Sequence, residues 1–209
     1  MAPSLLNCDV LNIVFEYIDY VMPFDKRLSC WFVNNFQFAH KFKTRRGKNL
    51  LMIYSSKGNV ANVRKLLQNK ANINDAYPAN GYSALLFANN KNVVKELLKW
   101  NPDVNMQCTL NKKTALMNAC SSGSHYISKL LLETGKCKIN IQDRYGNNAI
   151  MYASINGHLS IVKEILKYDP ILTLVNRSEL NVMSLAYINN NNKMFILLCH
   201  SLQKGDNKN

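Results

Sequence analysis

The feature of this sequence that most constrains its fold is a repeat with a period of about 33 residues. An apolar or small residue recurs about once in each period, at Val63, Val94, Ser128, Val162 and Phe195. Periods of roughly 20 to 50 residues are typical of solenoids, in which each unit must stack on its neighbours to bury its apolar face. The sequence therefore predicts a row of similar stacked units.

The fourth unit shows most clearly what each unit contains. Ala149, Ile150 and Ala153 lie at helical spacing before a break at Gly157. A second apolar stripe at helical spacing follows the break and consists of Ile161, Val162, Ile165 and Leu166. Each unit is therefore predicted to be a helix, a turn and a second helix.

Short motifs at the borders of the units carry a family signature. Two units end in Lys70-Ala-Asn-Ile-Asn74 and Asn101-Pro-Asp-Val-Asn105, and the fourth unit opens with Asp143-Arg-Tyr-Gly146. These segments resemble the Gly-Ala-Asp-Val-Asn ending and the Asp-x-x-Gly opening of ankyrin repeats, which share the period described above. The resemblance covers roughly residues 46–200 and implies an all-α fold. That fold is an ankyrin-repeat solenoid, built of helix-turn-helix repeats with short hairpin loops.

The repeat borders divide the chain into three predicted parts. About five ankyrin repeats are expected in residues 46–201, near 46–76, 77–108, 109–142, 143–176 and 177–201. A small helical module precedes them in residues 1–45, and a flexible polar tail follows in residues 202–209. The last unit has a polar turn at Asn189 to Asn192 and no hairpin after it, as expected of a C-terminal cap. The second unit is three residues short between Ala88 and Val94.

Residues 1–45 have a pattern of their own, with two apolar helix faces separated by Pro23. This pattern resembles the F-box, the module that docks on the adaptor subunit of SCF-type ubiquitin ligases. Apolar anchors at i, i+4 and i+8, supplied by Val10, Val14 and Ile18, suit a helix that binds in a groove. The resemblance implies that the adaptor is contacted by Leu6, Val10, Leu11, Val14, Phe15, Ile18 and Leu28.

The F-box pattern is incomplete, because Asn7 stands where that family has proline and Val33-Asn34 replaces Cys-Lys. An alternative is that the N-terminal helices only cover the apolar face of the first repeat, since every solenoid needs a cap at each end.

The two resemblances together imply a protein–protein interaction adaptor. Its repeats would bind an unidentified protein ligand, and its N-terminal module would recruit the SCF adaptor subunit and the cullin ligase. Fusions of this kind occur in intracellular bacteria and large DNA viruses, which suggests a pathogen protein acting in the host cytoplasm. One alternative is an ankyrin-repeat scaffold or inhibitor whose N-terminal helices are only a cap.

Ankyrin-repeat proteins bind their ligands with the hairpin tips and the surface of the first helices. Transferred to matching positions of this sequence, that property predicts ligand contacts at Tyr82, Lys113, Arg144, Tyr145 and Asn147. Tyr and Arg are also the side chains that most often anchor protein interfaces.

The charge of the chain supports a second alternative, a basic nucleic-acid-binding protein. The formal net charge is +13, and cations are concentrated in the segment 41–48. Such a surface favours acidic proteins, nucleic acid or anionic membranes as partners. The basic run also resembles a nuclear import signal, so the nucleus is considered beside the cytoplasm. The most apolar N-terminal stretch is broken by Glu16 and Asp19, and we expect a soluble, intracellular protein.

No residue spacing in the sequence suits catalysis or metal binding. Cys120 and His125 are close in sequence, but Cys120 and Gly123 occupy the turn between the two helices of a repeat. The four histidines and six cysteines lack the paired spacing of zinc ligands. We therefore expect no enzymatic activity, no metal and no cofactor.

Overall fold

The computed structural model describes residues 43–44 and 47–206, with side chains up to residue 203. Within these residues the secondary structure is helical and contains no strand; Lys43 and Asn49 form an isolated antiparallel bridge. This confirms the all-α prediction for the described part of the chain. The predicted F-box-like module, including Leu6 to Leu28, lies outside the described residues.

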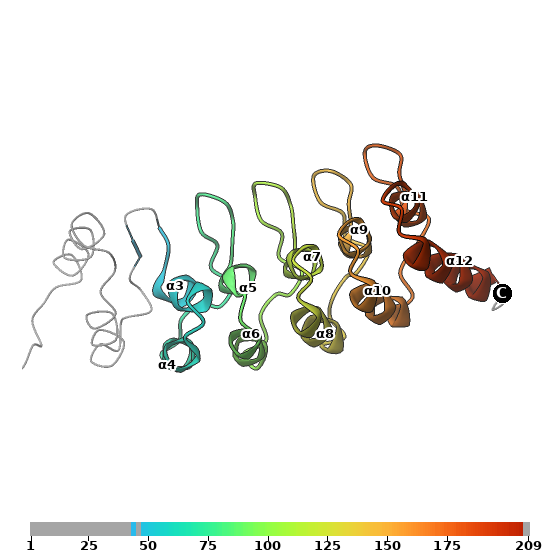
Figure 1. The fold of residues 1–209 in the computed structure, drawn as a ribbon. Helices are drawn as coiled ribbons and strands as arrows, with labels where there is room; N and C mark the ends of the chain where they lie inside the picture. Colours follow the sequence, from blue (N-terminus) through green and yellow to red (C-terminus); the bar gives the residue numbers. More distant parts are fainter. Residues whose placement is uncertain (1–42, 45–46, 207–209) are drawn as a thin grey trace, which may run out of the picture. The chain divides into compact units, whose positions relative to one another are not determined.

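The chain divides after Pro102 into two compact units. In the first unit, α3 (Leu50–Ser56) is followed by α4 (Val60–Gln68), and α5 (Ala84–Phe87) is followed by α6 (Lys91–Leu98). The first helices α3 and α5 pack side by side, and so do the second helices α4 and α6 (Figure 1). Each repeat of this unit is therefore a helix pair, and the two pairs stack on one another, as the sequence predicts.

The second unit contains three more helix pairs. They are α7 (Ala115–Ser121) with α8 (His125–Glu133), α9 (Ala149–Ile155) with α10 (Leu159–Ile165), and α11 (Val182–Ile188) with α12 (Asn192–Asp206). A 3₁₀ turn, η2 (Leu166–Tyr168), extends α10. Within this unit α9 packs between α7 and α11, and α8 packs beside α10 (Figure 1).

Each of these first helices begins after a polar residue that caps its N-terminus. The side-chain oxygen of this residue accepts a hydrogen bond, 2.9–3.4 Å long, from the backbone N–H three residues later. The five capping residues are Asn49, Ser83, Thr114, Asn148 and Asn181. Such caps satisfy a backbone donor that the helix itself leaves free, so they set where each first helix starts.

The turn inside three of the repeats depends on a glycine with positive φ, between +70° and +75°. A side chain of the following repeat lies over each of these glycines. The three pairs are Gly58 with Asn90, Gly123 with His158, and Gly157 with Asn191. The left-handed backbone favours glycine at all three positions, and at Gly123 a Cβ would in addition lie 2.6 Å from the His158 ring.

The second repeat lacks this turn glycine. Its first helix, α5, has four residues, whereas α3, α7, α9 and α11 each have seven. The chain leaves α5 at Phe87 and starts α6 at Lys91. The three-residue gap in the sequence pattern between Ala88 and Val94 therefore corresponds mainly to a shorter first helix.

The recurring position that defined the repeat is part of the buried core. Val63, Val94, Ser128 and Val162 are all fully buried on the second helices. Phe195, the fifth member, is only half-buried because it lies on the last helix pair. The sequence period thus identifies residues that pack one repeat on the next.

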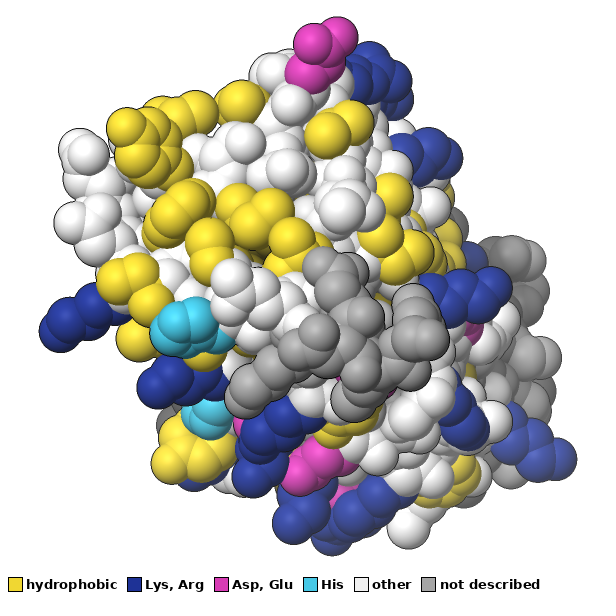
Figure 2. Space-filling view, turned by 90° about the vertical axis from the view of Figure 1, so that its right-hand side faces the viewer, with side chains coloured by type: hydrophobic (Ala, Val, Ile, Leu, Met, Phe, Trp, Pro, Cys, Tyr) yellow, Lys and Arg dark blue, Asp and Glu magenta, His cyan; other side chains and the backbone are white. Residues whose placement is uncertain are grey.

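The last helix pair ends the described repeats with large apolar residues. The sixth residue after the N-cap is fully buried in three repeats, as Ser55, Cys120 and Ser154, but in the last repeat it is Tyr187, which is 70% exposed. Ile188 and Ile196 are also exposed, and Figure 2, which faces this end, shows hydrophobic side chains gathered there. A tyrosine is too large for the space that the serine or cysteine fills in the other repeats. The last repeat therefore differs from them in the size of the side chain at this position.

One predicted boundary differs from the structure. Helix α12 continues to Asp206, so residues 202–206, which the sequence pattern assigned to a flexible tail, are helical. Polar residues prolong a helix whose preceding turns are already held by packing, because each added residue contributes one further backbone hydrogen bond.

Candidate ligand surface on the hairpins and first helices

Arg144 and Tyr145 lie exposed at the tip of the hairpin before α9, where a ligand contact was predicted. The Arg144 N–H donates to the Asn111 carbonyl oxygen of the preceding hairpin, and the Tyr145 carbonyl oxygen accepts from the Arg177 N–H of the following one, each at 2.9 Å. The Tyr145 side chain is 57% exposed. The tip is therefore held between its neighbours while both of its side chains face solvent.

Two glutamine side chains tie the hairpins of the second unit together. Gln107 Nε2 donates to the carbonyl oxygen of Lys112 in its own hairpin (2.6 Å) and to that of Gln142 in the next (3.1 Å). Gln142 repeats this pattern with Gly146 (2.6 Å) and Val175 (2.8 Å). These side-chain amides satisfy backbone carbonyls in both hairpins, so hydrogen bonds link the successive hairpins of this unit.

Asparagines near the ends of the repeats add further links. Asn105 Nδ2 donates to the Lys136 carbonyl oxygen (2.9 Å), and its Oδ1 accepts from the Lys138 N–H (2.7 Å). Asn147, a predicted ligand contact, is half-buried, and its Oδ1 accepts from Asn176 Nδ2 at 3.0 Å. Part of the polar surface named from sequence therefore joins repeats to one another.

Lys113 was predicted as an exposed contact, but the structure places it half-buried over an aromatic ring. Its Nζ lies 3.8 Å from the centroid of the Tyr152 ring in the next repeat. The Tyr152 hydroxyl in turn donates to Asp143 Oδ2 at 2.6 Å. Burial lowers the pKa of Lys113, with Asp143 acting in the opposite direction. Burial, together with the bond to Asp143, raises the pKa of Tyr152.

The first unit contains the same arrangement, which the sequence reasoning missed. Lys48 Nζ lies 4.1 Å from the centroid of the Phe87 ring. In both units the lysine directly precedes the N-cap residue of a first helix. The aromatic residue lies four positions after the N-cap residue of the next first helix. The lysine and the ring are therefore equally far apart in the sequence in the two pairs. This shared spacing of a lysine and an aromatic residue is the sequence signal from which the two cation–π contacts could have been predicted. Such cation–π contacts contribute about 0.5–2 kcal/mol, depending on their exposure.

Tyr82, another predicted contact, belongs to an aromatic cluster around Phe87. The ring centroids of Tyr82 and Phe87 are 5.2 Å apart, and those of Tyr77 and Phe87 are 6.0 Å apart. Tyr82 is half-buried. With Lys48 over the same Phe87 ring, this cluster forms the first-helix surface of the first unit, and Tyr82 can offer a ligand only part of its ring.

The cysteines considered from sequence offer no reactive thiol at the turn of the third repeat. Cys120 is fully buried, and its burial raises the pKa of its thiol; burial also raises the pKa of Cys137 to about 11. A thiol in this state is a poor nucleophile, because the thiolate is the reactive form. Among the described residues no group of three or more His, Cys, Asp or Glu side chains is placed to hold a metal ion.

None of the helices in the described part of the chain combines the length and apolarity needed to cross a membrane. The seven residues assigned to the ligase adaptor, from Leu6 to Leu28, all precede the described residues.

Comparison with known proteins identifies the repeats. A family model described as "Ankyrin repeats (3 copies)" matches residues 25–108 and 86–176, which together span about three quarters of the chain. The match begins at residue 25, inside the segment 1–45 that the sequence pattern assigned to a separate module. No curated protein matches the chain.

Proposed function

Because the chain belongs to the ankyrin-repeat family, we propose that it is a protein–protein interaction adaptor that binds a protein ligand on its hairpins and first helices. The observation that carries the proposal is the hairpin tip at Arg144 and Tyr145, where two exposed interface-forming side chains stand on a backbone held from both sides. A pre-organised surface loses little conformational entropy on binding, and so retains more of its contact energy as affinity.

The proposal includes recruitment of the bound ligand to an SCF-type ubiquitin ligase through the N-terminal segment. Its support is the sequence alone, namely the apolar face of Val10, Val14 and Ile18 and the similarity of the whole segment to the F-box. A docking element on the same chain as the repeats would bring a bound protein to the ligase. In a pathogen protein this activity would be directed at host proteins.

A pull-down from cytosolic extract tests the adaptor proposal. The intact chain is expected to recover the SCF adaptor subunit and its cullin, and the variant Val14→Asp/Ile18→Asp is expected to recover neither. The matched variant Arg144→Gln/Tyr145→Ala alters the repeats and should still recover both. Recovery of the ligase by the Val14→Asp/Ile18→Asp variant, or its absence with the intact chain, would contradict this part of the proposal.

The alternative of a scaffold or inhibitor with an N-terminal cap has one observation in its favour. The ankyrin match starts at residue 25, so part of the N-terminal segment is itself similar to a repeat. If the segment is only a cap, its deletion should lower the melting temperature and remove no partner. Nucleic-acid binding is the remaining alternative, and it requires an affinity that falls steeply with salt and with neutralisation of Lys41, Lys43, Arg45 and Arg46.

A further inference from the structure

We infer that the ligand of the second unit is an acidic, extended polypeptide segment that lies across the hairpin tips. This inference rests on the proposed interaction function and adds the chemistry of the partner. The surface in question, named here the hairpin row, consists of residues 106–113, 141–147 and 174–180.

Positive charge dominates the exposed side of the hairpin row. It contains four cations, Lys112, Lys113, Arg144 and Arg177, and two carboxylates, Asp143 and Glu179. Lys112, Arg144 and Arg177 are exposed and Lys113 is half-buried, whereas Asp143 is buried. Among the described residues no carboxylate forms an ion pair with any of these four cations. The exposed charges of the row are therefore three cations, Lys112, Arg144 and Arg177, and one carboxylate, Glu179, so the net charge that faces solvent is positive.

Asp143 interacts electrostatically with the half-buried Lys113 but forms no ion pair with Arg144 or Arg177, because its carboxylate is occupied within its own repeat. Oδ1 accepts hydrogen bonds from the N–H groups of Tyr145 (2.8 Å) and Asn147 (2.9 Å), and Oδ2 accepts from the Tyr152 hydroxyl (2.6 Å). A carboxylate with three donors is stable in this position without a cation. Asp143 thus shapes the hairpin and leaves the tip arginines available.

The two arginines occupy equivalent places in successive hairpins. They lie one repeat apart in the sequence, and the N–H of each donates at 2.9 Å to a carbonyl oxygen of the preceding hairpin, Asn111 for Arg144 and Tyr145 for Arg177. Their backbones therefore recur at the interval of the stack. Guanidinium groups bind carboxylates through paired hydrogen bonds, so a regular row of them suits a chain that carries carboxylates at intervals.

Exposed apolar side chains beside the arginines favour a polypeptide over a phosphate backbone. Leu110 is 62% exposed at the tip of one hairpin and Tyr145 is 57% exposed at the next. A leucine gains from contact with apolar side chains of a peptide and offers nothing to phosphate or sugar. The combination of arginine, tyrosine and leucine therefore fits a segment in which acidic and apolar residues alternate.

Fluorescence anisotropy with the full chain tests this inference. The probe is a labelled peptide of alternating Asp or Glu and Tyr or Leu, and the comparison peptide has Lys at every acidic position. The variant Arg144→Gln/Arg177→Gln should bind the acidic probe at least about tenfold more weakly, since charge-assisted pairs are lost and tenfold corresponds to about 1.4 kcal/mol. The control Lys95→Gln/Lys163→Gln removes the same charge from exposed second-helix positions and should bind as the unchanged chain does.

Three outcomes would overturn the inference: equal weakening by the two double variants, binding of the lysine peptide as tight as that of the acidic one, or tighter binding of an RNA or DNA duplex. Failure of the inference can be told from failure of the proposed function by capture from extract. If a protein is captured in a way that needs Tyr145 but neither arginine, the interaction function stands and the acidic ligand is excluded. If capture needs none of the hairpin residues, the proposed surface itself is wrong.

Discussion

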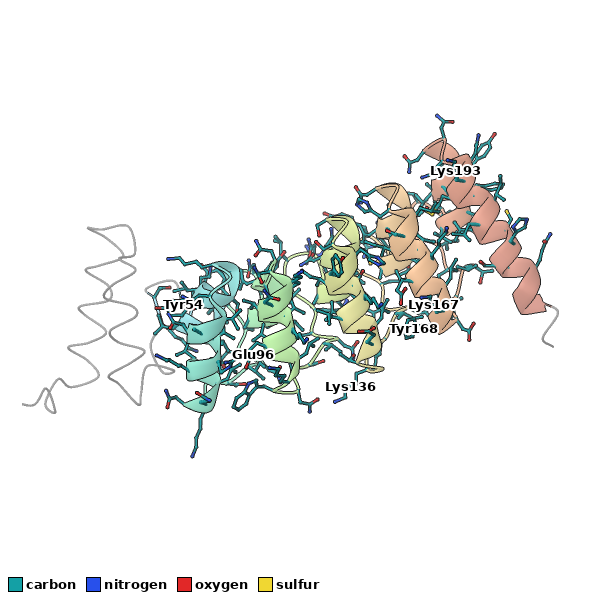
Figure 3. All side chains as sticks on the ribbon, turned by 60° about the horizontal axis from the view of Figure 1, so that its bottom comes forward. Tyr54, Glu96, Lys136, Lys167, Tyr168 and Lys193 are labelled. Carbon is teal, nitrogen blue, oxygen red and sulfur yellow. The ribbon has the colours of Figure 1, made fainter. Side chains whose placement is uncertain are left out.

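Arg64 on α4 and Glu96 on α6 form a two-point ion pair, with Nε–Oε1 and Nη2–Oε2 distances of 3.0 Å each. Lys99 Nζ lies 3.0 Å from the same Oε2 atom. The Glu96 side chain is 5% exposed, whereas both cations are about half exposed. Figure 3 labels Glu96 beside the second helices of this unit. The ion pair joins the second helices of two neighbouring repeats. The stability of the first unit should therefore depend on the charge of the Glu96 carboxylate.

Stability that depends on Glu96 should be lost in acid. The hydrogen bond from Arg64, opposed by burial and assisted by Lys99, lowers the pKa of Glu96 from 4.5 to about 2. A carboxyl whose folded pKa lies below its unfolded pKa stabilises the protein above the unfolded value, and this contribution disappears as the pH falls through the folded value. We expect Glu96→Gln to lower the melting temperature at pH 7, and the difference from the unchanged chain to shrink between pH 4.5 and about 2.

The control for this experiment is Glu133→Gln. Glu133 is about half exposed and lies 3.8 Å from Lys129, so its removal should change the melting temperature little at any pH. Thermal unfolding followed by circular dichroism across the pH range measures both variants. A pH-independent difference between Glu96→Gln and the unchanged chain would contradict the prediction.

Replacing the turn glycine Gly123 by alanine should destabilise the second unit in two ways, through its left-handed backbone and through a clash with the His158 ring. Gly123 has φ +70°, and a Cβ there would lie 2.6 Å from His158 Cε1. The left-handed backbone costs about 1–2 kcal/mol for an alanine, and displacement of the His158 ring adds to this. Gly135 is the matched control, because its φ is +66° and no atom lies within 4 Å of its Cβ position.

Urea unfolding of Gly123→Ala and Gly135→Ala separates the two effects. The Gly135 variant is expected to show the backbone cost only, and the Gly123 variant is expected to be the less stable of the two. Equal losses would mean that the His158 ring moves aside without cost.

Exchanging residues between the last repeat and the one before it should have unequal effects on stability. Ser154 is fully buried and its hydroxyl donates to the Val182 carbonyl oxygen (3.4 Å), whereas Tyr187 holds the equivalent position on α11 and is largely exposed. Ser154→Tyr should cost about 1–3 kcal/mol or more, because the space between α9 and α11 is filled. Tyr187→Ser should change stability by about 0.5 kcal/mol or less. Denaturant midpoints measure both; a large loss from Tyr187→Ser would show that its ring is packed.

Removing the Tyr152 hydroxyl should destabilise the second unit while leaving the lysine over the ring. Tyr152→Phe keeps the ring beneath Lys113 but takes the 2.6 Å hydrogen bond from the buried Asp143 carboxylate. The expected loss is about 1–3 kcal/mol, typical of a bond to a charged group that becomes unsatisfied. Tyr152→Leu should lose more, since the cation–π contact goes as well. Equal losses in the two variants, measured by urea unfolding, would mean that the ring contributes nothing beyond its hydroxyl.

Local patterns in the sequence were sufficient for the repeat architecture. The buried residues Val63, Val94, Ser128 and Val162 followed from their spacing, because every repeat must present the same apolar position to the next. The helix-turn-helix order followed from helical periodicity and from the turn glycines. These features depend on residues close together in the chain, where helical periodicity and glycine preferences act directly.

The character of the candidate surface was less accessible from sequence. Arg144 and Tyr145 are exposed as expected, but Tyr82, Lys113 and Asn147 are half-buried. Lys113 and Asn147 each meet a group in the next repeat, the Tyr152 ring and the Asn176 amide, and Tyr82 meets the Phe87 ring at the end of the helix that follows it.

By itself, the sequence determined the helix pairs, which follow from local periodicity, and the period with its recurring buried residues, which follow from the repetition of one pattern along the chain. Only the tertiary structure decided that Lys48 and Lys113 lie over aromatic rings of the next repeat, that His158 covers Gly123, and that Asp143 turns its carboxylate inward. The physical reason is distance along the chain: most of these contacts join side chains about one repeat apart, and their geometry exists only after one repeat has packed on the next.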